Sequence, residues 1–198
     1  PGVGQCYMQP RIDKAYHRFP GEIIPRLVGE GLEPRIALEF TGSLLDGLYK
    51  SGNFEALYAL RQAFTDARYR DRVELLGAPW GHAHAPSTRP EDYVLHLTAW
   101  CNHIAALFGL DVLARVRVFS PSEMALPIHP DIAYHMINNL AFVGPGYRGI
   151  IVQADTVETL DGKPVANPNL PHRLIVESSV GETRQIVAFL KKGGSVGA

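Results

Sequence analysis

Short apolar runs alternate with longer helical segments along most of this chain, and this alternation constrains the fold more than any other feature. Five runs have the length and composition of strands. They are Val3–Met8, Arg35–Thr41, Arg72–Gly77, Arg115–Ser120 and Gly149–Asp155. Each is apolar enough to be covered on both faces, as strands of parallel sheets are. The pattern therefore predicts an α/β protein in which β-α units carry a largely parallel sheet.

The segments between these runs have helical periodicity. The clearest helix is predicted over Pro90–Phe108, where apolar residues recur at spacings of three and four. Pro90 suits the first position of a helix and Gly109 suits the residue after its end. Further helices are predicted over Ser43–Lys50, Asn53–Ala67 and Asp131–Ala141.

The pattern changes after Asp155. Two strands are predicted over His172–Ser178 and Thr183–Leu190, and the short turn between them indicates a β-hairpin. A flexible end follows the hairpin. We expect a partial barrel with the catalytic site over residues 1–158, and a C-terminal β-hairpin with a flexible tail over 159–198.

The number of β-α units limits the architecture. A closed (β/α) barrel in its common form needs eight strands and about 250 residues, whereas this chain has 198 residues. We therefore predict an incomplete (β/α) barrel of about five β-α units. Its exposed strand edge would invite pairing with a second copy of the chain, forming a homo-oligomer.

Charge and cysteine content exclude several classes of protein. The chain has 19 basic and 20 acidic residues and a net charge of -1, which does not predict binding to nucleic acid. No run of 18 apolar residues and no signal peptide is visible, so we expect a cytoplasmic protein that does not enter the membrane. Because the sequence starts at Pro1 and not at methionine, it leaves open that a leader has been removed. Cys6 and Cys101 form no C-x-x-C motif, and we expect both to be reduced.

Glu123 is the first candidate for a catalytic residue. It follows the fourth predicted strand, and α/β enzymes place their chemistry at the carboxyl ends of strands. Pro121 and Pro127 flank it and stiffen the turn. Asp155 ends the fifth predicted strand in the equivalent position. Two carboxylates on adjacent strand ends suit glycoside hydrolysis, although Asp155 could instead cap the following turn.

The loop after the third predicted strand gathers Trp80, His82 and His84. An aromatic wall with a few polar groups is one way to hold a sugar, so we predict that these residues bind substrate. Alternatively, Trp80 fills the top of the barrel beside solvated histidines. A metal site with Asp155 or His129 is disfavoured, because no third ligand occurs at a diagnostic spacing, and we predict no bound metal.

Two further carboxylates lie inside predicted strands. Glu39 belongs to the second predicted strand and Glu74 to the third. Carboxylates in such positions are more often buried and paired than catalytic, and we favour that interpretation here.

Three stretches of the chain resemble glycoside hydrolase family 57, whose members are retaining enzymes acting on α-glucans through an incomplete, seven-stranded (β/α) barrel. Gln9-Pro10 looks like the end of the first motif of that family, 73–86 like its second and Phe119–Met124 like its third. The resemblance implies that Glu123 is the nucleophile. It also implies that Gln9 contacts substrate, although Met8 stands where the family carries a histidine.

The family's motif for the acid/base aspartate does not occur in this chain, and Asp155 is the candidate for that role. We expect an amylase-like enzyme that acts on α-linked glucans or oligosaccharides with retention, by hydrolysis or by transfer, and that needs no cofactor. The sequence also leaves open that the chain is a fragment of such an enzyme. Two other functions stay open as well, a metal-dependent polysaccharide deacetylase and a carbohydrate-binding relative without activity.

Overall fold

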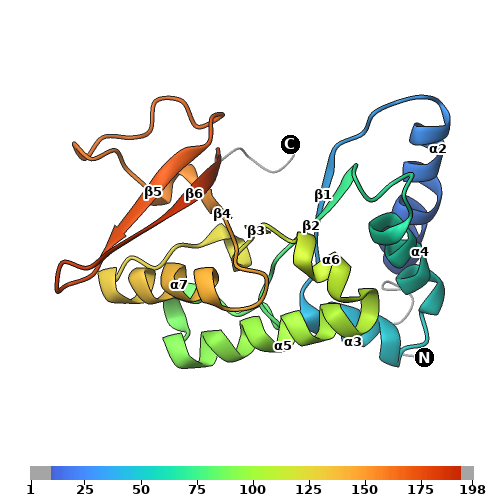
Figure 1. The fold of residues 1–198 in the computed structure, drawn as a ribbon, viewed down its shortest axis with the longest axis horizontal. Coiled ribbons are helices and arrows are strands. Elements are labelled where there is room, and N and C mark those ends of the chain that lie inside the picture. Colours follow the sequence, from blue (N-terminus) through green and yellow to red (C-terminus); the bar gives the residue numbers. More distant parts are fainter. Residues whose placement is uncertain (1–9, 193–198) are drawn as a thin grey trace.

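The computed structural model describes residues 10–192 (Figure 1). The predicted first strand, Val3–Met8, lies outside the described residues, and so do Gln9 and most of the predicted flexible tail. Mixed helices and strands make up the rest, which confirms the α/β class.

Two sheets, one parallel and one mixed, contain all the strands of the described residues. Their strands are β1 (Ile36–Glu39), β2 (Val73–Leu76), β3 (Val118–Phe119), β4 (Gly149–Gln153), β5 (His172–Glu177) and β6 (Thr183–Lys191). β1 pairs with β2, and the second sheet has the order β3-β4-β6-β5. Every pairing is parallel except that of β5 with β6. Four of the five strands predicted for the β-α units thus appear, and these four run in the same direction.

A single bridge joins the two sheets. The Gly77 amide donates to the Val118 carbonyl, and the Ser120 amide donates to the Gly77 carbonyl, both at 2.8 Å. A Cβ atom on Gly77 would lie 2.3 Å from the Tyr147 ring, so glycine leaves the space that this ring fills. The strands therefore continue across this seam from β1 to β5.

The predicted helices are confirmed. α5 spans Pro90–Phe108, the predicted bounds, and the ends of the other predicted helices differ from the prediction by at most two residues. Those helices are α3 (Gly42–Lys50), α4 (Phe54–Thr65) and α7 (Pro130–Phe142).

Two helical segments were not predicted. A π-helix, Ile12–Ile23, runs directly into α2 (Ile24–Gly29), and Pro20 inside it breaks the usual helical pattern of donors. α6 (Leu110–Arg115) takes Arg115 out of the fourth predicted strand. The Arg115 guanidinium donates to carbonyls of Phe64 and Arg70, which fixes this residue at the helix end and leaves β3 short.

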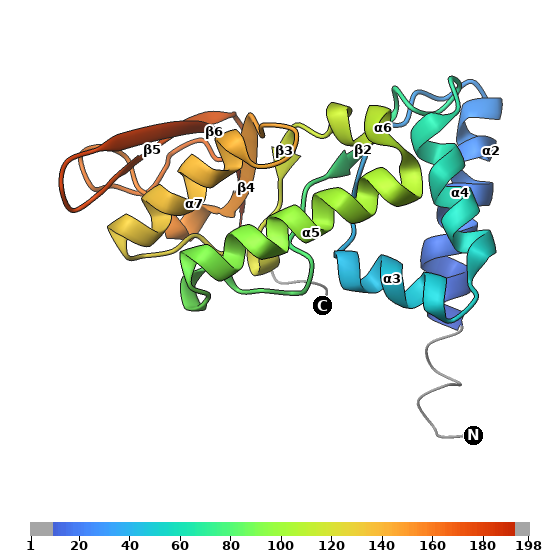
Figure 2. The same ribbon diagram turned by 60° about the horizontal axis from the view of Figure 1, so that its bottom comes forward.

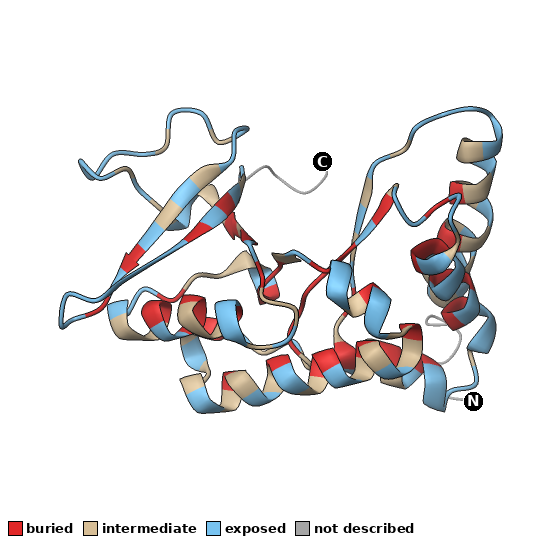
Figure 3. Ribbon diagram, in the orientation of Figure 1, coloured by how far each residue is buried: buried red, intermediate tan, exposed pale blue. Residues whose placement is uncertain are grey.

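Helices cover the strands from one side. α5 runs beneath both sheets and links them, as Figure 2 shows, while α7 packs against β5 and β6. Trp100 on α5 is fully buried, and its indole N–H donates to the Phe40 carbonyl at 2.8 Å. Buried residues lie along the strands and on the facing sides of α5 and α7 (Figure 3). This core holds the carboxyl ends of the strands in place.

The C-terminal hairpin is confirmed and belongs to the second sheet. β5 and β6 pair antiparallel, and β6 also pairs along its length with β4. The division of the chain at residue 158 stays a prediction. Within residues 10–192, no helix has the length and apolar character needed to cross a membrane.

Candidate active site

Glu123 lies in a short turn, Ser122–Met124, directly after β3. The turn is at the carboxyl ends of the parallel strands, where the sequence places it. Glu123 has φ 57° and ψ 13°, and Met124 has φ 53°. Two successive non-glycine residues in the left-handed region are uncommon, and strain of this kind collects at functional sites. The turn presents the Glu123 carboxylate to solvent.

One side chain from a loop and one from a strand end hold Glu123. The His82 Nε2 atom lies 2.9 Å from Glu123 Oε1, and the side-chain amide of Gln153 donates to the backbone carbonyl of Glu123 at 2.8 Å. His82 comes from the loop after β2, and Gln153 ends β4. The side chains of His82 and Glu123 remain 60% and 69% exposed. The carboxylate is thus oriented by a histidine and still open to a ligand.

Asp155 lies on the adjacent strand end, in a turn (Ala154–Thr156) that follows β4. Its side chain is exposed, and the described part of the chain offers it no hydrogen-bond partner. Gln153 precedes the turn in the capping position, but its side chain makes no capping hydrogen bond and donates to the Glu123 carbonyl. Gln153 therefore connects the strand end that carries Glu123 with the one that carries Asp155, two residues further on.

Trp80 is wedged between α3 and α5. Its ring packs edge-on against His103, with centroids 5.1 Å apart, and it covers Gly42 so closely that a Cβ there would lie 2.3 Å away. The Trp80 carbonyl accepts from the Ser43 amide at 2.7 Å. Trp80 is half-buried by these contacts, and its stacking on a sugar stays a prediction.

The two histidines of the loop differ. His82 reaches Glu123, whereas the His84 Nδ1 atom pairs with the Ser87 hydroxyl at 2.8 Å and stays exposed. The structure therefore brings one of the two to the carboxylate. A substrate contact by His84 or by Gln9 stays a prediction.

Glu39 and Glu74 are both exposed, which corrects the expectation that they are buried. Glu39 accepts a hydrogen bond from the Ser120 hydroxyl at 2.6 Å, across the strand between them. Sequence analysis missed Ser120 and Gln153 as parts of this region. Their position at strand ends was the available signal, because Glu39, Ser120 and Gln153 all close apolar runs.

A buried phenol lies close to Glu39. Burial, and secondarily the negative charge of Glu39, raise the pKa of Tyr93, so the phenol stays protonated at neutral pH. Within residues 10–192 the hydroxyls of Tyr93 and Ser122 are buried without a hydrogen-bond partner. In the same part of the chain, no three His, Cys, Asp or Glu side chains gather closely enough to hold a metal ion.

No family model and no curated protein matches the chain. Among solved structures, the crystal structure of the 4-alpha-glucanotransferase from Thermococcus litoralis is similar, with a TM-score of 0.66 and 14% sequence identity. The similarity covers 96% of this chain and 26% of that enzyme, so the chain spans about a quarter of its length. The two proteins share a fold over this region.

Proposed function

We propose that this chain carries the catalytic centre of a retaining enzyme that acts on α-linked glucans or oligosaccharides, with Glu123 as the nucleophile. The observation that supports it most is the Glu123 carboxylate, held by His82 at 2.9 Å on the carboxyl edge of the parallel strands. A fold shared with a 4-alpha-glucanotransferase supports the same proposal, and so do the motifs that resemble glycoside hydrolase family 57.

The architecture we infer is an incomplete (β/α) barrel. All strands except β5 run parallel, with α5 and α7 on one side. The opposite side carries exposed residues of β1 and β2, among them Glu39 and Glu74. In a barrel this would be the inner side, and the carboxyl ends of the strands would form its mouth.

The chemistry follows from two carboxylates. Glu123 attacks the anomeric carbon while the bond to the leaving oxygen breaks, and Asp155 gives its proton to that oxygen. Asp155 then takes a proton from water in hydrolysis, or from a sugar hydroxyl in transfer, and the acceptor oxygen displaces Glu123. Two inversions give net retention. Neither step requires a cofactor.

The remaining predicted residues would form the subsite around this pair. His82 orients the nucleophile and can contact a sugar hydroxyl with its exposed edge. Gln9, Trp80 and His84 would line the same subsite. Its exposure suits a chain-like substrate that enters from solvent.

The test uses aryl α-glucosides with good and poor leaving groups. Glu123→Gln abolishes turnover of both substrates and covalent labelling by a mechanism-based glycosyl fluoride. Asp155→Asn lowers the rate by about 10²- to 10⁴-fold on the poor leaving group and much less on the good one. Glu74→Gln, an amide substitution on the neighbouring sheet, is the matched control and keeps activity. Undiminished labelling of Glu123→Gln would remove Glu123 from the role.

Chelation of an acetyl-releasing activity and a binding measurement separate the two other functions. A deacetylase would lose activity with a strong chelator and regain it with zinc, whereas the two-carboxylate mechanism is indifferent to chelation. A binding relative without activity would keep its affinity for the glucan in Glu123→Gln and release no product with either protein.

A further inference from the structure

The outer edge of β5 carries an unused set of backbone hydrogen-bonding groups. β5 is the last strand of its sheet and pairs with β6 on one side. On its other side, no strand between residues 10 and 192 pairs with it. Edge strands of this length are templates for pairing with another chain unless something covers them.

The ladder between β5 and β6 determines which residues face the open edge. The register runs from His172 opposite Ala188 to Glu177 opposite Thr183, and the Ser178 amide continues it by donating to the Glu182 carbonyl at 2.8 Å. Bonded and non-bonded pairs alternate in an antiparallel ladder, so the even-numbered residues of β5 bond to β6. The amides and carbonyls of the odd-numbered residues 173, 175 and 177 therefore point outward.

The side chains of these three residues have a symmetric charge pattern. Arg173 and Glu177 are exposed and flank Ile175, which is 43% exposed. All three lie on the face away from α7, because their even-numbered neighbours turn toward the helix and the core. Neither charged side chain forms an ion pair among the described residues.

A second β5, laid antiparallel with Ile175 opposite Ile175, satisfies all of these groups. Arg173 then faces the partner's Glu177, and Glu177 faces the partner's Arg173. The three opposing pairs fall on the residues whose backbone groups point outward, so each pair exchanges two hydrogen bonds. A register shifted by one residue would meet backbone groups that β6 already uses.

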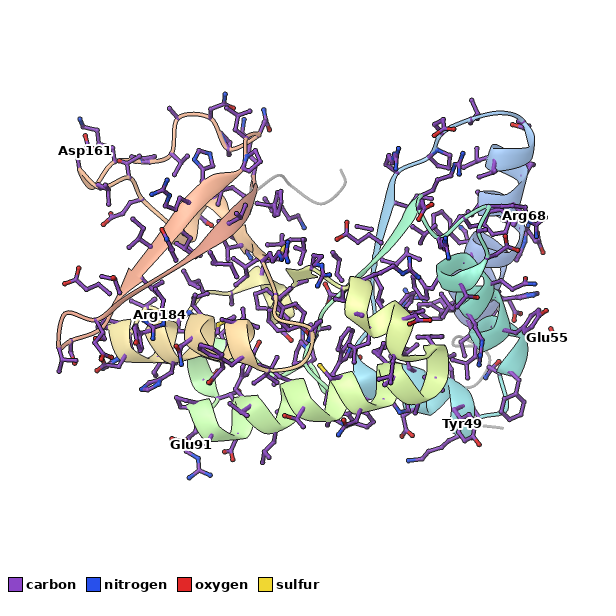
Figure 4. All side chains as sticks on the ribbon, viewed as in Figure 1. Tyr49, Glu55, Arg68, Glu91, Asp161 and Arg184 are labelled. Atoms are coloured by element: carbon purple, nitrogen blue, oxygen red, sulfur yellow. The ribbon has the colours of Figure 1, made fainter. Side chains whose placement is uncertain are left out.

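Open space borders the N-terminal half of this edge. An open cavity of about 710 Å³ borders Arg173, Leu174 and Ile175, and the preceding loop, with Asp161 at its tip in Figure 4, forms its other wall. Val187 and Phe189 of β6 are exposed on the same face as Ile175. The helix side is already filled, since Arg184 binds Asn138 of α7 at 2.7 Å.

We propose that the chain forms a two-fold symmetric dimer by antiparallel pairing of β5 with β5, centred on Ile175. The dimer joins four strands from each copy into one sheet, and two Arg173–Glu177 ion pairs fix its register. This association is independent of the proposed catalysis, because Glu123 and Asp155 lie on other strand ends.

Sedimentation velocity of the full chain over a concentration series tests the proposal. Wild type shows a monomer–dimer equilibrium that weakens with added salt. Arg173→Glu and Glu177→Arg each place like charges opposite one another and weaken the dimer by about tenfold. The double variant restores it with the charges exchanged. Glu91→Arg, a charge reversal on α5, is the control and dimerises as wild type does.

Amide hydrogen exchange gives a second readout that does not depend on a substitution. Protection of the amides of residues 173, 175 and 177 increases with protein concentration, whereas the even-numbered amides of β5 are protected at every concentration. A chain that stays monomeric, a dimer that leaves the odd-numbered amides unprotected, or single charge reversals without effect would overturn the proposal.

Discussion

Glu123 and Met124 are the residues of the candidate site with strained backbone conformations. Both have left-handed backbone angles, which cost an L-residue about 1–2 kcal/mol each. Two hydrogen bonds hold this turn. The side-chain amide of Gln153 donates to the Glu123 carbonyl, and the backbone amide of Ala125 donates to the Ser122 carbonyl at 3.2 Å. The turn aims the carboxylate away from the core and toward His82.

A glycine–alanine comparison at residue 124 tests this strain. Met124→Gly is more stable than Met124→Ala by about 1 kcal/mol, because both lose the methionine side chain and only glycine relaxes at positive φ. Urea denaturation measures the difference. At Ala125, where φ is -80°, the order reverses and Ala125→Gly destabilises the chain. Equal stability of the two variants at residue 124 would show that the turn is not strained.

At the scale of elements, the C-terminal hairpin is fastened to α7. Asp131, in the first turn of α7, accepts hydrogen bonds from the Ser179 amide at 2.7 Å and the Ser179 hydroxyl at 2.8 Å. These two hydrogen bonds lower the pKa of Asp131 below its usual 3.8. The carboxylate therefore joins the hairpin turn to the helix.

Asp131→Asn lowers the melting temperature at neutral pH, because the neutral amide accepts these hydrogen bonds more weakly. A carboxyl with a lowered pKa stabilises the folded chain above pH 3.8, and this contribution disappears as the pH falls through the folded-state pKa. The difference between wild type and variant therefore narrows in acid. Asp111→Asn, in the first turn of α6, is the control for the helix dipole and shows a smaller difference. A pH-independent difference would contradict the role of the charge.

The elements differ in how far the sequence predicts them. α5 was predicted to its last residue because Pro90 and Gly109 mark its ends. The segment Ile12–Ile23 escaped prediction, since Pro20 inside a helix contradicts the usual rule and its packing on α4 decides the outcome. β3 is shorter than its apolar run, because the Arg115 side chain binds distant carbonyls that no local pattern reveals.

The candidate site was predictable in the same uneven way. Glu123 and Asp155 were chosen as candidates because they lie at or just after the ends of apolar runs, and their catalytic roles stay predictions. Gln153 was missed, because an amide at the end of a strand carries no signal until its partner on the neighbouring loop is known. Trp80 shows the reverse, since an aromatic residue in a polar loop suggests a ligand, whereas its contacts with Gly42 and His103 depend on tertiary packing.

At the scale of the whole molecule, one bridge joins the two sheets. Gly77 exchanges hydrogen bonds with Val118 and Ser120 while the Tyr147 ring lies over its Cα. This contact places the loop that carries His82 beside the turn that carries Glu123. The site therefore depends on a glycine that does not touch it.

Gly77→Ala destabilises the chain by about 1–3 kcal/mol, since the added methyl group meets a buried ring. It also weakens the contact of His82 with Glu123, and activity falls with stability. Gly47→Ala, in α3 with no atom within 4 Å of the added Cβ, is the control and leaves stability unchanged or slightly higher. Chemical denaturation of both variants checks this. An unchanged midpoint for Gly77→Ala would show that the seam tolerates a side chain.

The most direct test of the catalytic proposal is to find where a sugar becomes attached. The chain is incubated with a mechanism-based α-glycosyl fluoride and digested, and its peptides are mapped by mass spectrometry. We predict one added glycosyl group, on the peptide that contains Glu123 and on that carboxylate. A label on another residue, or turnover of an aryl α-glucoside that Glu123→Gln leaves intact, would contradict the account.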